Sequence, residues 1–193
     1  MIILQIGTNK GYDDITKYVF NYKDILEKFI AIEPLVVHNI SINECYKEIP
    51  QLIIENVAIV PRVVSPTMTF YYHQDDGPGF EVASSDKNHI LKHQIYNSKL
   101  TEEGIIECTI PCMTINDMFE KHNLTKIDIL YIDAEGMDFE IIKSIDFKYD
   151  IVNIIYEHLH IDGEAAIKFL ENKGYTTSRN FGHNGWSHAA IKQ

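Results

Sequence analysis

The chain of 193 residues is long enough for one domain with a substantial core, and its 45% hydrophobic and 23% charged residues are typical of a globular protein. A net charge of −11 argues against a nucleic-acid partner, because an acidic surface repels phosphate backbones and the lysines and arginines form no cluster. The apolar opening is too short for a signal peptide and no stretch is long enough to span a membrane, so we expect a cytoplasmic protein without a membrane partner.

Apolar runs alternate with helix-like patterns along the chain. This alternation predicts an α/β fold with a mostly parallel central sheet and helices on both faces. In chain order, the first elements expected are strands at 2–6, 29–33 and 52–60, a helix that Asp13 and Asp14 begin, and a second helix through Ile42, Cys45, Tyr46 and Ile49.

Residues 66–112 break this alternation. They predict a β-rich or lid-like insertion within a single domain of residues 1–193. The alternating TFYYH at 69–73 is expected to be extended, and DDGPGF at 75–80 is expected to form a turn.

Regular patterning returns after Pro111, where Thr114 and Asp117 have the spacing of a helix cap. The remaining elements expected in chain order are strands at 127–133 and 151–158, a short helix through Phe139, Ile142 and Ile145, a helix from Asp162 to Lys173 that Gly174 ends, and a closing antiparallel hairpin from Tyr175 to SHAAIK at 187–192.

The three cysteines, Cys45, Cys108 and Cys112, show no metal-like pairing. Cys108 and Cys112 are close enough in sequence to bind a metal or form a disulfide. Small, buried, free thiols in a reducing compartment are the more usual arrangement, and we expect that one.

A glycine-rich segment, Gly7-Thr8-Asn9-Lys10-Gly11, follows the first strand and precedes a helix. Glycines are needed where backbone must approach a ligand or adopt dihedral angles that a Cβ forbids. Glu33, at the end of the second strand, stands where nucleotide-binding α/β units place an acid that binds ribose hydroxyls. An ordinary solvated acid at a strand end is the alternative.

Asp133 and Glu135 fall at the carboxyl end of a predicted strand, where α/β sheets collect their functional groups. Gly136 permits a turn into the next helix. Two carboxylates at one edge of a sheet repel each other unless solvent, a cation or a ligand surrounds them. Acidic residues also stabilise a helix N-terminus, so we expect this pair both to take part in a site and to begin the next helix.

Together these segments resemble the FkbM family of S-adenosylmethionine-dependent methyltransferases. The matching segments are Gly7 to Gly11, Ile32-Glu33-Pro34, Ile115-Asn116-Asp117, Ile132-Asp133-Ala134-Glu135-Gly136 and Glu157-His158. The resemblance implies a Rossmann-like class I methyltransferase fold, S-adenosylmethionine as cofactor, and methyl transfer to a hydroxyl of a small-molecule or glycan acceptor such as a sugar or a polyketide-like natural product.

The resemblance also implies roles for single residues. The methionine part of the cofactor would be wrapped by Gly7, Thr8, Asn9 and Gly11, and its ribose would be held by Glu33 with Pro34. Its adenine would be bordered by Asn56, Val57 and Ala58. Asp133 would face the amino group or the methyl group of the cofactor. Glu135, Glu157 and His158 would surround the acceptor hydroxyl. His158 is the expected base, because the pKa of an imidazole lies nearest physiological pH.

The sequence departs from the family pattern at three points. Gln5 stands where an acidic residue is usual, Tyr131 stands where a lysine is common, and the chain begins directly at its first strand. These departures favour a catalytically inactive cofactor-binding module as the alternative. A nicotinamide-dependent oxidoreductase would explain the glycines and Glu33, but not the segment at 132–136.

Two further interpretations concern histidines and aromatic residues. His158 and His160, two residues apart, would share a strand face and could join His183, His188 and Asp133 around a divalent metal; because no ligand motif is present, we expect no metal. Tyr71, Tyr72, Phe80 and Trp186 could line an acceptor pocket, although core packing is the more common role of such residues.

Overall fold

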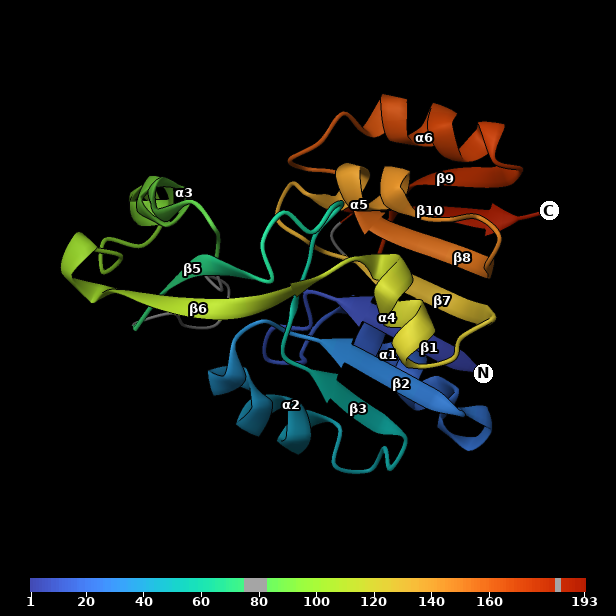
Figure 1. Ribbon diagram of the computed structural model, residues 1–193, viewed down its shortest axis with the longest axis horizontal. Coiled ribbons are helices and arrows are strands. Elements are labelled where there is room, and N and C mark those ends of the chain that lie inside the picture. The colour runs from blue at the N-terminus through green and yellow to red at the C-terminus, as the bar shows by residue number, and fades with distance from the viewer. Residues whose placement is uncertain (75–82, 183–184) are drawn as a thin grey trace. The chain divides into compact units, whose positions relative to one another are not determined.

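A computed structural model describes residues 1–74, 83–182 and 185–193 (Figure 1). The expected turn at 75–80, together with Phe80 and His183, lies outside the described residues. The chain forms two compact units: unit 1 comprises Met1–Val63 and Met113–Gln193, and unit 2 comprises Val64–Cys112. The stretch in which the sequence loses its alternating pattern falls within unit 2.

Unit 1 is built on a 7-stranded sheet, as far as the chain is described, in the order β3-β2-β1-β7-β8-β10-β9. The first five strands of this order run parallel, and β10 is antiparallel to both of its neighbours. The strands are β1 (Ile2–Ile6), β2 (Lys28–Ile32), β3 (Leu52–Glu55), β7 (Lys126–Ile132), β8 (Asp150–Glu157), β9 (Tyr175–Phe181) and β10 (Ser187–Lys192). The expected mostly parallel sheet with a closing hairpin is confirmed.

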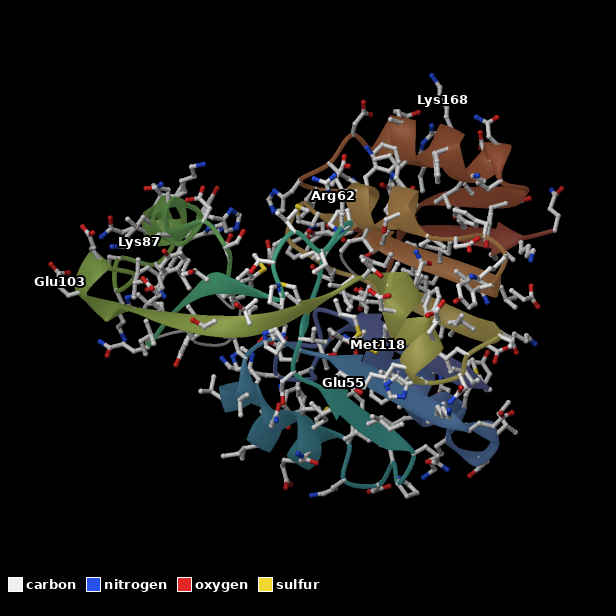
Figure 2. All side chains as sticks on the ribbon, in the orientation of Figure 1. Glu55, Arg62, Lys87, Glu103, Met118 and Lys168 are labelled. Carbon is white, nitrogen blue, oxygen red and sulfur yellow. The ribbon has the colours of Figure 1, made fainter. Side chains whose placement is uncertain are left out.

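Helices cover both faces of this sheet, as expected. One face packs against α1 (Asp14–Asn21) and α2 (Asn39–Cys45), and the other against α4 (Ile115–Lys121), α5 (Asp138–Ser144) and α6 (Gly163–Asn172). Figure 1 shows α4 and α5 in front of the strands and α1 behind them. In Figure 2, Met118 marks α4, where its side chain is buried in the core, and Lys168 projects from α6 away from the sheet.

The helices begin at the residues that the sequence indicated. Thr114 and Asp117 form a reciprocal capping box at α4, Asp13 and Thr16 form another at α1, and the Asp162 carboxylate accepts the Ala165 N–H at α6. These side chains satisfy N–H groups that the first turn of a helix leaves without partners.

The predicted strand at 52–60 is wrong as a single element. The structure divides it into β3 and the short β4 (Ala58–Ile59). Asn56 causes the break, because its side-chain amide donates to the Glu33 carbonyl (2.8 Å) and forms two hydrogen bonds with the Asn39 side chain (2.8 and 2.9 Å). A side chain committed in this way draws the backbone out of the strand.

Unit 2 pairs two antiparallel strands, β5 (Thr67–His73) and β6 (Ile105–Met113), the last residue of β6 belonging to unit 1. Between them lie α3 (Lys87–Lys92) and two short 3₁₀ turns, at His93–Ile95 and Glu102–Gly104. An ion pair from Lys87 Nζ to Glu102 Oε1 (2.7 Å) links α3 to the second turn, and Figure 2 labels Lys87 and the neighbouring Glu103. Cys108 and Cys112, like Cys45, are free and only partly buried.

None of the helices in the described parts of the chain is both long and apolar enough to cross a membrane.

Candidate active site

The direction in which successive strands are added to the sheet reverses between β1 and β7. From β1 the chain moves outward through β2 to β3 and then returns to place β7 on the other side of β1. Open α/β sheets bind ligands outside the carboxyl ends of their strands at such a reversal. Gly7 is the first residue after β1 there, and Asp133 is the first residue after β7.

Gly7 allows these two strand ends to approach each other. A Cβ at this position would lie 1.8 Å from the Asp133 carbonyl oxygen, and Gly7 has φ +77°. The N–H groups of Gly7 and Thr8 both donate to the Ile32 carbonyl, at 3.0 and 3.1 Å, which ties the turn to the end of β2. A glycine is therefore needed at position 7 for two reasons: a Cβ would clash with Asp133, and the positive φ disfavours other residues.

Three buried polar atoms around this turn have no hydrogen-bond partner among the described residues. They are Gln5 Oε1, Thr8 Oγ1 and Asn9 Oδ1. Gln5 and Thr8 are 0% and 1% exposed. Because buried polar atoms are costly when left without a partner, the turn has the donor and acceptor capacity to bind a polar ligand.

Glu33 anchors the same turn. Its carboxylate accepts the N–H of Asn9 (2.7 Å) and the N–H of Leu35 (2.9 Å), and His38 Nδ1 lies 3.4 Å from Oε1. Glu33 is 4% exposed, so it is not the solvated acid of the alternative interpretation. Each carboxylate oxygen has a second lone pair, which leaves acceptor capacity for ligand hydroxyls.

The three residues expected to border the adenine have different environments. The Asn56 side chain is fully engaged with Asn39 and the Glu33 carbonyl. Val57 and Ala58 are 5% and 7% exposed, and Val57 packs into the core on the α4 side of the sheet.

An acidic group lies next to position 5, although Gln5 itself is neutral. Its amide donates to Asp13, the residue that caps α1, so a carboxylate lies next to position 5. Burial raises the pKa of Asp13 to about 6, although the Gln5 hydrogen bond acts to lower it. Tyr131 is buried in the core on the α1 side and hydrogen-bonds Ser187.

Asp133 lies among other carboxylates. Burial, followed by the charges of Glu157, Glu135, Asp138 and Asp13, raises its pKa well above the ordinary value. No described residue donates a hydrogen bond to its side chain. A desolvated carboxylate surrounded by negative charge is a position where a positively charged group binds favourably.

Asp138 is a residue of this site that sequence reasoning missed. It is fully buried at the start of α5, and its two carboxylate oxygens accept the N–H groups of Ala134 (3.2 Å) and Gly136 (3.1 Å). It therefore fixes the turn that carries Asp133 and Glu135, the latter at φ +49°. The sequence signal that could have identified Asp138 is its place two residues after the pair Glu135-Gly136.

The expected acceptor group is only partly brought together. Glu135 and Glu157 are close to each other and to His160, with side-chain ligand atoms all within 4.8 Å. His158 instead directs Nε2 to the Gly185 carbonyl (3.0 Å) and stacks on His188, with ring centroids 4.0 Å apart. The expectation that His158 and His160 share a strand face is wrong, because β8 ends at Glu157 and His160 lies in the turn beyond it.

The aromatic residues considered for an acceptor pocket belong to different units. Tyr71 and Tyr72 lie on β5 in unit 2, whereas Trp186 lies in unit 1 beside β10 and is 54% exposed. Their role at an acceptor stays a prediction.

A family model for the methyltransferase FkbM domain matches residues 5–177, which include the glycine turn, Glu33, Asp133 and Glu157. The chain belongs to the FkbM methyltransferase family. No curated protein sequence matches it significantly.

One solved structure shares the fold of this FkbM domain, and a second is similar to it. A methyltransferase FkbM from Methylobacillus flagellatus KT has a TM-score of 0.57 at 10% identity, covering 98% of this chain and 43% of that one. A precorrin-6y C5,15-methyltransferase from Geobacter metallireducens GS-15 has a TM-score of 0.48 at 13% identity, covering 100% of this chain and 80% of that one. The FkbM chain described here thus spans less than half of the Methylobacillus protein, and at 10% identity the likeness to that protein shows the fold alone.

Proposed function

We propose that this chain binds S-adenosylmethionine and transfers its methyl group to a hydroxyl oxygen of a sugar or another small natural product. One observation carries the proposal: the β1–β7 junction places a glycine turn with partnerless buried polar atoms opposite the desolvated carboxylate of Asp133. A ligand with hydroxyl, amino and sulfonium groups matches that combination of hydrogen-bonding atoms and negative charge.

The residues of unit 1 fit this cofactor. Gly7 to Gly11 would bind its methionine part, and the remaining lone pairs of Glu33 would accept the ribose hydroxyls. Asp133 would pair with the amino group, and the apolar side chains of Val57 and Ala58 would border the adenine. Because Asn56 is engaged with Asn39, its proposed part is to shape this border rather than to contact the ligand.

The protein's chemical task at the acceptor is to orient a hydroxyl and remove its proton. When bound, S-adenosylmethionine supplies a methyl carbon that forms a bond to the acceptor oxygen while its bond to sulfur breaks, the electron pair remaining on sulfur. His158 remains the proposed base. Its Nε2–H donates to Gly185, so the neutral ring keeps an unprotonated Nδ1 that can take the proton.

Calorimetric titration with S-adenosylmethionine, S-adenosylhomocysteine and NAD tests the cofactor. We expect micromolar binding of the first two, weakened about tenfold or more by Asp133→Asn and by Glu33→Gln, because each change removes one charge-assisted contact. Asp133→Asn is the sharper variant, because Glu33 also anchors backbone. Glu120→Gln, on the exposed face of α4, should change nothing.

Two outcomes would contradict the proposal. Absence of S-adenosylmethionine binding, or equal binding by the Asp133 variant, would remove the assigned site. Binding of NAD alone would support the oxidoreductase alternative.

An inactive cofactor-binding module is the second candidate function, and Gln5 is the observation that favours it. Its amide is committed to Asp13 and its carbonyl oxygen has no partner among the described residues. Tight cofactor binding without methyl transfer to any member of a panel of sugar and polyketide hydroxyls would identify the module.

A further inference from the structure

Three potential metal ligands converge where the chain leaves two neighbouring strands. Glu135 follows β7, Glu157 ends β8, and His160 comes three residues later. The two strands are adjacent and parallel, with Ile132 paired to Tyr156, so the loops after them must adjoin. His160 Nε2 lies 3.9 Å from Glu135 Oε2, and one ligand atom from each side chain lies within 4.8 Å of the other two.

The backbone at Gly136 permits this convergence. Gly136 has φ +95°, and a Cβ there would lie 3.3 Å from the Cβ of His160. A larger residue would therefore hold the two loops apart. The turn on the β7 side is fixed independently, because the buried Asp138 carboxylate accepts two of its N–H groups.

The chemistry of the three groups suits a divalent transition metal. An imidazole nitrogen with two carboxylates is a ligand set that binds Mn²⁺, Fe²⁺ or Zn²⁺. Metal–ligand bonds of about 2.0–2.2 Å place neighbouring ligand atoms roughly 3–4 Å apart, which requires only small movements from the spacing seen here. Three protein ligands leave coordination positions open for acceptor oxygens.

The charge at this edge of the sheet also favours a bound cation. Asp133, the residue after β7, adds a third carboxylate near Glu157 and Glu135. Carboxylates that lie close together repel one another unless a positive charge is bound among them.

We propose that Glu135, Glu157 and His160 bind a divalent cation that holds the hydroxyl groups of the acceptor beside the methyl-transfer site. Binding of the cation depends only on these side chains. Its role toward an acceptor rests on the proposed function. The site differs from the histidine set considered from the sequence, because His158 is turned toward Gly185 and His188.

The test uses MnCl₂ alone with the chelator-treated protein of residues 1–193, and free Mn²⁺ is followed by its electron paramagnetic resonance signal. We expect saturable loss of the free signal in the unmodified protein. His160→Ala and Glu157→Gln should each raise the Kd about tenfold or more, because each removes one of three ligands. His122→Ala and Glu120→Gln, both at the C-terminal end of α4, serve as matched controls, and circular dichroism checks that every variant is folded.

Unchanged Mn²⁺ affinity in both ligand variants, or no binding by the unmodified protein, would overturn the cation site. Titration of the same proteins with S-adenosylmethionine separates this result from failure of the proposed function. Cofactor binding without Mn²⁺ binding would overturn only the cation site. Mn²⁺ binding that needs His160 and Glu157, without cofactor binding, would support the cation site and overturn the methyltransferase proposal instead.

Discussion

At the scale of single residues, the site depends on carboxylates that folding removes from water. The charges of Asp138 and Asp13 both act on Asp133; Asp138 is bonded to the turn after β7, and Asp13 is bonded to Gln5 and caps α1. Burial is the largest cause of the raised pKa of each, which is about 6 in both cases. Such groups make the stability of the fold depend on pH.

Asp13→Asn should change this pH dependence. The pKa of Asp13 is raised from 3.8 to about 6, so the folded state holds its proton more tightly than the unfolded state. The original protein therefore loses stability, relative to the variant, as pH rises from about 4 through 6. The relative loss approaches about 3 kcal/mol at pH 7.

Urea denaturation at pH 4.5, 6 and 7.5 measures this difference. Asparagine can still accept the Ile15 N–H that the cap satisfies, so the helix start is retained. Asp24→Asn, at an exposed position, is the control. A stability difference that stays constant over the three pH values would show that the Asp13 carboxyl is not perturbed by folding.

At the scale of elements, the contact between the ends of β1 and β7 decides where a ligand can bind. Two glycines with positive φ offer a matched comparison. A Cβ at Gly7 (φ +77°) would meet the Asp133 carbonyl, whereas a Cβ at Gly174 (φ +91°) would have no described atom within 4 Å. Alanine at either position carries backbone strain of about 1 kcal/mol. Only Gly7→Ala also forces two strand ends apart.

We therefore expect Gly7→Ala to lower the free energy of unfolding by about 1–3 kcal/mol more than Gly174→Ala does. It should also weaken binding of S-adenosylmethionine, because the turn that carries Thr8 and Asn9 must move. Equal destabilisation by the two variants, measured by urea unfolding, would show that the close approach of Gly7 to Asp133 has no energetic consequence.

At the scale of the whole molecule, the residues described as the site all belong to unit 1. The two segments of this unit meet where unit 2 departs and returns, because the Val60 N–H donates to the Met113 carbonyl at 2.9 Å. A short connection can therefore replace residues 64–112 without stretching the backbone. The lid-like role expected for this region from the sequence stays a prediction.

Replacing 64–112 with a linker of about four glycine and serine residues should leave a folded unit 1. We expect one cooperative unfolding transition with a smaller denaturant m-value, because less surface is exposed on unfolding. Affinity for S-adenosylmethionine should remain within about threefold of that of the full chain. Loss of cooperative unfolding would show that unit 1 requires unit 2 to fold.

Much of the fold was predictable because its signals are local. Apolar strands, helix spacing, the acids Asp13 and Asp14 at a helix start and the cap pair Thr114–Asp117 act within a few residues of each other, and the structure confirms the elements they begin. The family pattern was also visible, since its characteristic residue types stand at strand ends. The strand at 52–60 failed because the Asn56 side chain binds Asn39, a partner that the segment itself does not contain.

Most elements of unit 1 in their order, the glycine turn after β1 and the family could be read from the sequence, because each depends on residue types at short spacing. Which side chains meet could be known only from the folded chain. His160 joins Glu135 and Glu157 while His158 turns to His188, and the Asp138 carboxylate binds the turn that carries Asp133. These contacts depend on the order and register of the strands in the sheet. The residue pattern within one segment specifies neither the order nor the register.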